Sequence, residues 1–272
     1  MSLLQVHREG NGPPLVWLHG FTQTRLSASR FRSILAGSRE VWTLDLPGHG
    51  DAHHVSGSLD ETAALVLDAL GATPVDLGGY SFGGRVALHV ALRAPARVSR
   101  LVTLGASRGI QDPAEREARR RRDEALAAHL EQVGTDVFLD EWLSQPLFAT
   151  LPPDPAERAA RSRDPGGLAD SLRRAGTGTQ RWLDPLLGDL RSPLLALAGE
   201  RDLKFRAEAH ALAAGVPLGH DAIIERAGHA AHLEEPEATA AAILDFLGRD
   251  YDPRAAKATR AAAPTTNWAR EE

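Results

Sequence analysis

The chain has 272 residues, 43% hydrophobic and 25% charged, enough to bury a sizeable core in one globular domain with an elaboration. The formal net charge of −5 argues against a nucleic-acid or anionic-membrane partner, and no segment approaches about 18 consecutive apolar residues, so no membrane span is expected. The absence of cysteine excludes disulfides, thiol nucleophiles and cysteine-ligated metals.

The first eight residues, MSLLQVHR, are too short and too quickly polar for a signal peptide, so we expect a cytoplasmic protein. Short apolar segments typical of strands lie at 3–6 and 15–18, and the second runs directly into His19 and Gly20. Further segments of this kind follow at 41–44, 75–77, 101–104, 194–198 and 222–224, with helical patterns between most of them.

This alternation of strands and helices predicts an α/β fold, with a mostly parallel central sheet covered by helices on both faces. Between 107 and 190 the pattern holds helix starts but no convincing strand. One such start is Asp154, an N-cap followed by Pro155 and Glu157. We therefore predict a core made of residues 1–106 and 191–249 and a helical cap of residues 107–190 over the active site.

A nucleophile elbow, G-x-S-x-G, follows the strand at 75–77 and consists of Gly79, Ser81 and Gly83. Such a tight turn from strand to helix strains the serine backbone and needs glycines where a Cβ would collide with neighbouring elements. The pattern nominates Ser81 as the reactive group, although similar patterns also occur in ordinary turns.

An acid and a histidine follow later strands, Asp202 after 194–198 and His229 after 222–224. Alone, Asp202 fits a turn and His229 a surface position. Together with Ser81 they stand in the order Ser, Asp, His that is typical of α/β-hydrolases, each at the carboxyl end of a strand. We therefore predict that these three residues form a catalytic triad.

The turn after 15–18 predicts one donor of an oxyanion hole, the backbone N–H of Phe21. The second donor is expected to be the N–H of Phe82, directly after the nucleophile. Amides fixed in advance stabilise developing negative charge without reorganising.

Arg85 lies four residues after Ser81 on the helix that the elbow starts, so its side chain is predicted to lean toward the pocket. An unpaired guanidinium there is costly unless an anionic substrate supplies a partner. The alternative is an ion pair with a buried carboxylate. Four consecutive arginines at 119–122 are flanked by acidic residues and fit a solvated helix, with at most one or two facing inward.

No metal or cofactor is expected. The histidines His49, His53 and His54, and the pair His229 and His232, have no carboxylates at ligand spacing to complete a site. A glycine-rich phosphate loop is also missing from the sequence.

Five separated segments make the chain resemble the 2-succinyl-6-hydroxy-2,4-cyclohexadiene-1-carboxylate synthases, a menaquinone-pathway branch of the α/β-hydrolases. The similarity runs from about residue 3 to 247 and includes the cap. The first two segments below are widespread in the superfamily, whereas the last three together are restrictive. They are LHGFT (18–22), DLPGHG (45–50), GYSFGGR (79–85), WLSQPLF (142–148) and GERDLKF (199–205).

The resemblance implies an α/β-hydrolase fold with a helical cap, the triad Ser81, Asp202 and His229, and no cofactor. It further implies carboxylate-binding arginines and two other pocket residues. Any of Arg120 to Arg122 could take the place of Arg119 after a one-residue slip or a rotation of the helix. These implied positions are Arg85, Arg119, Arg163, Tyr80 and Trp142.

The reaction implied by the resemblance is elimination of pyruvate from 2-succinyl-5-enolpyruvyl-6-hydroxy-3-cyclohexene-1-carboxylate, a small tricarboxylate. Three arginines would bind its three carboxylates through charge-assisted hydrogen bonds. Other menaquinone-pathway enzymes are the implied partners, and a monomer or small homo-oligomer is expected. The alternatives are a serine esterase, thioesterase or C–C bond hydrolase with Ser81 as nucleophile, or a non-catalytic binding protein, against which an intact triad argues.

Residues 250–272 are poor in large apolar side chains and are predicted to be a disordered tail. Trp268 within it is assigned no role.

Overall fold

A computed structural model describes residues 2–250 of the chain, and the predicted tail, Trp268 included, lies almost wholly outside these residues. The described part contains one seven-stranded sheet in the order β1-β3-β2-β4-β5-β6-β7, parallel except for β1. Its strands are β1 (His7–Glu9), β2 (Pro14–Leu18), β3 (Glu40–Thr43), β4 (Val75–Tyr80), β5 (Val98–Leu104), β6 (Leu194–Gly199) and β7 (Gly219–Ile224). The predicted fold class is thereby confirmed.

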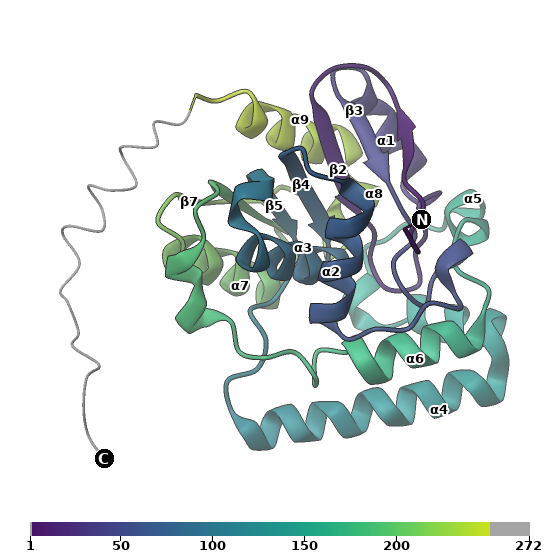
Figure 1. The fold of residues 1–272 in the computed structure, drawn as a ribbon. Helices are drawn as coiled ribbons and strands as arrows, with labels where there is room; N and C mark the ends of the chain where they lie inside the picture. The colour runs from purple at the N-terminus through teal and green to yellow at the C-terminus, as the bar shows by residue number, and fades with distance from the viewer. Residues whose placement is uncertain (1, 251–272) are drawn as a thin grey trace, which may run out of the picture.

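Helices cover both faces of this sheet, as Figure 1 shows. One face packs against α1 (Ser29–Ala36), α8 (Ala231–Glu234) and α9 (Pro236–Leu247), and the other against α2 (Leu59–Leu70), α3 (Phe82–Arg93) and α7 (Leu203–Gly215). Short 3-10 turns are η1 (Gly50–Ala52), η2 (Pro95–Arg97), η3 (Pro146–Phe148) and η4 (Asp184–Asp189).

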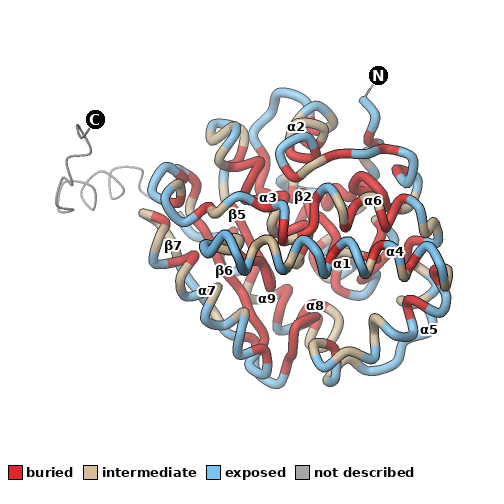
Figure 2. Tube along the Cα trace, turned by 90° about the horizontal axis from the view of Figure 1, so that it is seen from below, coloured by how far each residue is buried: buried red, intermediate tan, exposed pale blue. Residues whose placement is uncertain are grey.

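The inner strands are rich in apolar residues because both of their faces are covered, although β4 also contains the buried Asp76, which pairs with Arg39. Every residue of β4 and β6 is buried, and Figure 2 shows the strands mostly buried while the helices alternate between buried and exposed positions. The predicted strand at 3–6 is wrong: the first strand is β1, a short edge strand that pairs only with β3. The first strand forms at His7–Glu9 because these residues pair with the edge of β3. Leu3, in the segment where the strand was predicted, is exposed.

Between β5 and β6 the described chain is helical, with α4 (Pro113–Leu143), α5 (Pro155–Ala159) and α6 (Pro165–Ala175). α4 and α6 lie side by side below the sheet (Figure 1) and share an apolar cluster that contains Leu130, Phe138 and Leu168. A break at Gly134, with φ 77°, divides α4. The Asp154 side chain caps α5 as predicted by accepting hydrogen bonds from the N–H groups of Ala156 and Glu157.

Candidate active site

Ser81 lies at the turn from β4 to α3 with φ 50° and ψ −104°, a strained conformation for a residue with a side chain. The flanking glycines are required by close contacts. A Cβ on Gly79 would lie 2.4 Å from the carbonyl carbon of Gly83, and one on Gly83 would lie 2.2 Å from the carbonyl oxygen of Leu18. The elbow therefore fits only with glycine at both positions.

The structure brings Asp202, His229 and Ser81 together from three separate loops. His229 Nδ1 donates to Asp202 Oδ2 at 2.6 Å, and its Nε2 lies 3.3 Å from Ser81 Oγ. Asp202 and His229 are both buried. The carboxylate thus holds the imidazole in the tautomer whose Nε2 lone pair faces the serine hydroxyl.

Gly105, at the end of β5, supports the imidazole from behind. Its φ is +60°, and a Cβ there would lie 2.9 Å from His229 Cε1. On other sides the imidazole packs against the rings of Phe205, at a centroid distance of 4.5 Å, and Tyr80, at 5.3 Å. The histidine therefore has little freedom to turn away from Ser81.

Ser81 and His229 open onto a cavity of about 170 Å³ between the core and the cap. Larger hollows occur elsewhere in the described chain, but neither Ser81 nor His229 lines them. Within the part of the chain that the structure describes, no Asp or Glu lines this cavity. Of the residues that sequence analysis assigned to the site, it is lined by Phe21, Tyr80, Ser81, Phe82, Arg85, Arg119, Trp142 and His229.

Arg85 reaches the cavity from α3 and donates from Nη1 to the carbonyl oxygen of Ala175 at 2.9 Å. It forms no salt bridge within the described residues, so the alternative of a buried ion pair is not what the structure contains. Burial, and secondarily the positive charge of Arg119, lower the pKa of Arg85 to about 10. This side chain remains a cation at neutral pH and lacks an anionic partner.

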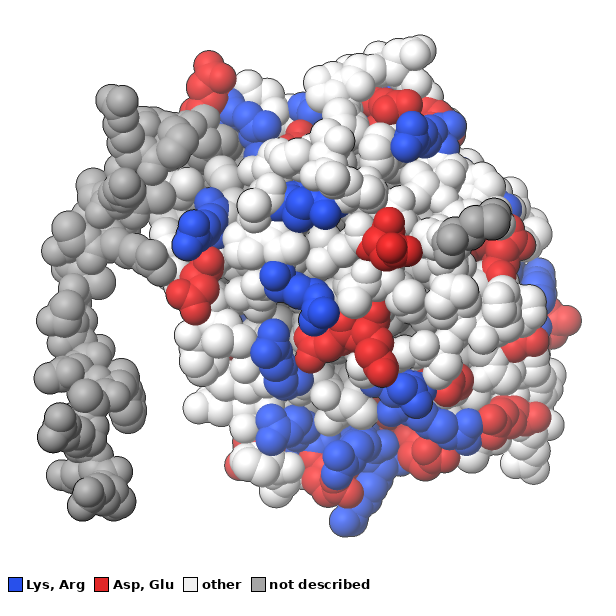
Figure 3. All heavy atoms as spheres, viewed as in Figure 1, with Lys and Arg blue, Asp and Glu red and all other residues white. Residues whose placement is uncertain are grey.

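Arg119 lines the cavity from the cap helix α4, and its Nε donates to Asp123 Oδ1 at 2.7 Å. Arg120 and Arg121 point outward and pair with Glu117. Figure 3 shows this mixture of acidic and basic side chains along the lower edge of the molecule, where Figure 1 places α4. The arginine run is thus a solvated face with one member turned inward.

Arg163 does not line this cavity. Its side chain is exposed and contacts Asp136 Oδ1 and the carbonyl oxygen of Arg158. The expectation that Arg163 belongs to the pocket is therefore corrected. Arg161, two residues earlier, is the buried arginine of this segment and donates to Thr22 Oγ1 at 2.5 Å.

Phe21 and Phe82 contribute backbone N–H groups that have no hydrogen-bond partner within the described residues. Their rings lie on two sides of the imidazole of His49, at centroid distances of 5.7 Å and 5.5 Å. His49 is fully buried, and burial lowers its pKa to about 3. A neutral histidine thus packs between the two residues expected to form the oxyanion hole.

Trp142 and Tyr80 line the cavity as expected. The indole of Trp142 stacks on Phe138, and its buried Nε1–H has no partner within the described residues. Burial raises the pKa of Tyr80 above its usual range, so this phenol is a neutral hydrogen-bond donor at all working pH values.

Lys204 is a cavity-lining residue that sequence analysis missed. It lies in the second position of α7, with Nζ 5.3 Å from the ring centroid of Phe205. Its place in the GERDLKF segment, two residues after Asp202, was the available signal.

Among residues 2–250, no helix combines the length and the apolar character that crossing a membrane requires. The same residues contain no cluster of three or more side chains suited to hold a metal ion.

A sequence profile of the alpha/beta hydrolase family matches residues 15–242. The chain is 34% identical over 250 residues to a protein of Serratia proteamaculans named 2-succinyl-6-hydroxy-2,4-cyclohexadiene-1-carboxylate synthase, covering 88% of this chain and 94% of the relative. A protein of the same name from Yersinia pseudotuberculosis is 34% identical over 246 residues, covering 88% of each chain.

Solved structures of the same fold include a MenH and an esterase. MenH from S. aureus superposes with a TM-score of 0.82 at 32% identity, covering 91% of this chain and 98% of that one. A thermophilic esterase from Thermogutta terrifontis, solved with malate bound, gives a TM-score of 0.74 at 26% identity, covering 90% and 92%. The chain therefore belongs to the alpha/beta hydrolase family and, within it, to the 2-succinyl-6-hydroxy-2,4-cyclohexadiene-1-carboxylate synthases, and it is an enzyme.

Proposed function

We propose that this member of the alpha/beta hydrolase family is a carbon–oxygen lyase of menaquinone biosynthesis. It eliminates pyruvate from 2-succinyl-5-enolpyruvyl-6-hydroxy-3-cyclohexene-1-carboxylate to give 2-succinyl-6-hydroxy-2,4-cyclohexadiene-1-carboxylate. The observation that carries the proposal is the charge of the Ser81 cavity, which among residues 2–250 is lined by Arg85, Arg119 and Lys204 and by no acidic side chain.

The cations of the cavity match the charge of this substrate, which bears three carboxylates. Arg85 and Arg119 each present a guanidinium suited to bidentate contact with a carboxylate, whereas Lys204 presents a point charge. Lys204 lies beside the positive end of the α7 dipole, which is an unfavourable place for a cation without an anionic partner. A bound tricarboxylate would give Arg85 and Lys204 anionic partners, and would add a second one to Arg119, which already pairs with Asp123.

In the proposed mechanism Ser81 acts as a general base. Its Oγ takes a ring proton from the substrate while its own proton passes to His229 Nε2, 3.3 Å away. Asp202 holds the imidazole in the required tautomer and stabilises the imidazolium that forms. The electron pair of the broken C–H bond forms the new ring double bond.

The bond between the ring and the enolpyruvyl oxygen breaks as that double bond forms. The leaving enolate of pyruvate takes a proton, and His229 then returns to the neutral form. The backbone N–H groups of Phe21 and Phe82 stabilise negative charge that develops on a substrate oxygen. No covalent intermediate on Ser81 is required, and the residues described need no cofactor for these steps.

The competing function is ester, thioester or C–C bond hydrolysis, in which Ser81 attacks a carbonyl carbon. The similarity to the Thermogutta terrifontis esterase favours this second candidate. A neutral ester, however, gives no partner to Arg85, and an unpaired guanidinium in a dry pocket is costly. The hydrolase alternative therefore also calls for an anionic substrate.

Pyruvate release tests the proposal directly. The substrate is generated enzymatically, and the rates with wild-type enzyme, Ser81→Ala and Arg85→Ala are compared with the spontaneous rate. Rapid release that both substitutions abolish supports the lyase. Release at the spontaneous rate, together with p-nitrophenyl ester cleavage that needs Ser81 but not Arg85, would assign the enzyme to the hydrolases.

A further inference from the structure

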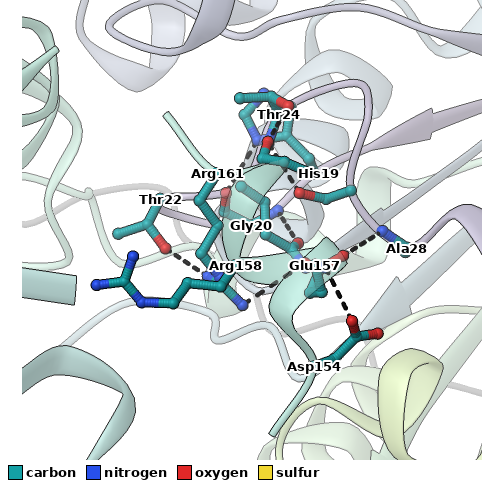
Figure 4. Close-up of polar contacts among 12 residues, drawn as sticks. His19, Gly20, Thr22, Thr24, Ala28, Asp154, Glu157, Arg158 and Arg161 are labelled. Atoms are coloured by element: carbon teal, nitrogen blue, oxygen red, sulfur yellow. Dashed lines mark hydrogen bonds and ion pairs between the residues drawn. The ribbon is translucent and has the colours of Figure 1, made fainter. Parts of the chain in front are cut away.

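The loop of residues 20–28, which carries the Phe21 N–H, is bonded to the cap segment 154–162. The N–H of Ser162 donates to the carbonyl oxygen of Thr22 at 2.8 Å, and Arg161 Nη1 donates to Thr22 Oγ1 at 2.5 Å. Thr24 Oγ1 donates to the carbonyl oxygen of Ala160 at 2.6 Å. Figure 4 shows these side chains converging from the two segments.

The carboxylate of Glu157 lies at the centre of this network and connects both ends of the loop. Oε2 accepts from the N–H of Ala28 at 2.7 Å. Oε1 accepts from Gln23 Nε2 at 3.1 Å, and Gln23 Oε1 in turn accepts from the N–H of Gly20 at 3.0 Å. Gly20 directly precedes Phe21, so two hydrogen bonds join Glu157 to the backbone next to the oxyanion donor.

The loop adopts a conformation that it would not keep by itself. Thr22 has φ 68° and Ala28 has φ 57°, both left-handed positions occupied by residues with a Cβ. Such positions cost on the order of 1 kcal/mol each and persist where surrounding contacts enforce them. At both positions the partner that enforces the conformation belongs to the segment 157–162.

Glu157 is itself held in place by a buried partner. Its Oε1 lies 3.6 Å from Arg161 Nη2, and the two side chains are 10% and 3% exposed. Truncating one member of a buried ion pair leaves the other charge unsatisfied. Removal of Glu157 would therefore leave Arg161 without its carboxylate and the N–H of Ala28 without its acceptor. Gln23 Nε2 would keep only its contact with His232 Nε2, at 3.2 Å.

We propose that Glu157 is a positioning residue that sets the oxyanion-hole loop, so that the Phe21 N–H points correctly only while the cap segment 154–162 is seated on the core. Glu157 does not line the cavity of Ser81 and acts through Gln23 and Ala28. This inference rests on the proposed roles of Ser81 and Phe21. It does not depend on which substrate the enzyme uses.

The test compares Glu157→Ala and Glu157→Gln with wild type, using the rate constant for labelling of Ser81 by a fluorophosphonate. The phosphoryl oxygen of this probe occupies the oxyanion hole during attack. We expect Glu157→Ala to lower the rate constant, and kcat for pyruvate release, by about 10- to 100-fold, because a displaced donor loses part of the factor of about 10² to 10³ that such a donor supplies. KM should change by less than about threefold, since no substrate contact is removed.

Glu157→Gln should restore part of the rate. A glutamine has one acceptor oxygen and can serve either Ala28 or Gln23, but not both. The control is Glu124→Ala, which removes an exposed acidic residue of α4 that pairs with Arg173, outside both this network and the segment 154–162. Its labelling rate constant should equal that of wild type.

The extent of labelling separates positioning from mere loss of fold. If Glu157 only supported the fold, a smaller fraction of the Glu157→Ala protein would be labelled, but that fraction would react at the wild-type rate constant. This result would overturn the inference. Equal rate constants and equal extents would overturn it as well. If wild type releases no pyruvate yet its labelling slows in Glu157→Ala, the proposed lyase function fails and the positioning role stands.

Discussion

Arg85 on the core helix α3 and Arg119 on the cap helix α4 face the same cavity, and burial together with the positive charge of Arg119 lowers the pKa of Arg85. Arg119 is paired with the buried Asp123, whereas Arg85 forms no salt bridge within the described residues, so Arg85 is the cation of this cavity that most favours an anionic ligand. One of these arginines belongs to the core and the other to the cap, so a ligand that contacts both would bridge the two parts.

Arg119→Ala should lower kcat/KM for the tricarboxylate by about 10- to 100-fold, since hydrogen bonds to charged groups are worth roughly 1.5–3 kcal/mol. The matched control is Arg121→Ala, an exposed position on the same helix, which should leave kcat/KM within about twofold. Steady-state kinetics of both variants check this. Equal losses in the two would mean that the whole arginine run acts through long-range charge.

Arg85→Met should raise the melting temperature of the ligand-free enzyme by about 2–4 °C. At every pH below about 10 the guanidinium is charged in the folded and the unfolded chain alike, so the folded state carries the full cost of burying it, and methionine removes that cost. Calorimetry at pH 7.5 measures the change, with the exposed Arg174→Met as reference. A fall of the same size in the melting temperature would show that the hydrogen bond from Arg85 to Ala175 stabilises the fold by more than burial of the guanidinium destabilises it.

Gly105→Ala should lower kcat by about 100-fold, the scale expected when a catalytic group moves by roughly 1 Å. The new Cβ would press on His229 Cε1, and alanine is strained at a φ of +60°. Gly188→Ala is the comparison, because a Cβ there meets nothing within 4 Å. Unchanged activity in Gly105→Ala would mean that His229 can shift without leaving Ser81.

Lys204→Met should raise KM for the tricarboxylate about three- to tenfold and leave kcat nearly unchanged, because a single exposed charge contributes roughly 1 kcal/mol or less. Arg206→Met, on the same helix, lies outside the cavity and serves as control. Kinetics at low and high salt add a second check, since the effect of Lys204 should shrink as salt screens it. An effect confined to kcat would place Lys204 in the chemical step.

Acid should destabilise the fold through two buried histidines. Burial lowers the pKa of His49 and of His232 to about 3, against 6.5 in an unfolded chain. Between these values the unfolded chain binds protons that the folded chain does not, so stability is lost as pH falls below about 6.5. The loss at pH 5 is about 2 kcal/mol for each histidine.

Urea unfolding of wild type, His49→Gln and the exposed His54→Gln at pH 7.5 and pH 5.0 measures this dependence. The difference in unfolding free energy between the two pH values should be smaller by about 2 kcal/mol in His49→Gln only. An unchanged difference would show that His49 is protonated in the folded protein.

The sequence by itself determined the features that local chemistry dictates. The nucleophile elbow could be recognised because its backbone conformation demands Gly79 and Gly83 within a few residues of Ser81. Six of the seven strands could be located because each contains a short run of apolar residues between helical patterns. Asp202 and His229 followed from strand ends, since the carboxyl ends of parallel strands meet at one edge.

Only the tertiary structure decided which side chains face the cavity. Sequence analysis selected Arg163, whereas the buried arginine of that segment is Arg161, because the contacts of 157–162 with the loop 20–28 set its rotation. Lys204 faces the cavity because α7 begins beside the cavity. β1 forms at His7–Glu9 because these residues pair with the edge of β3. The burial of Arg161 and the place of β1 depend on contacts between residues far apart in the chain, which a local sequence pattern does not display.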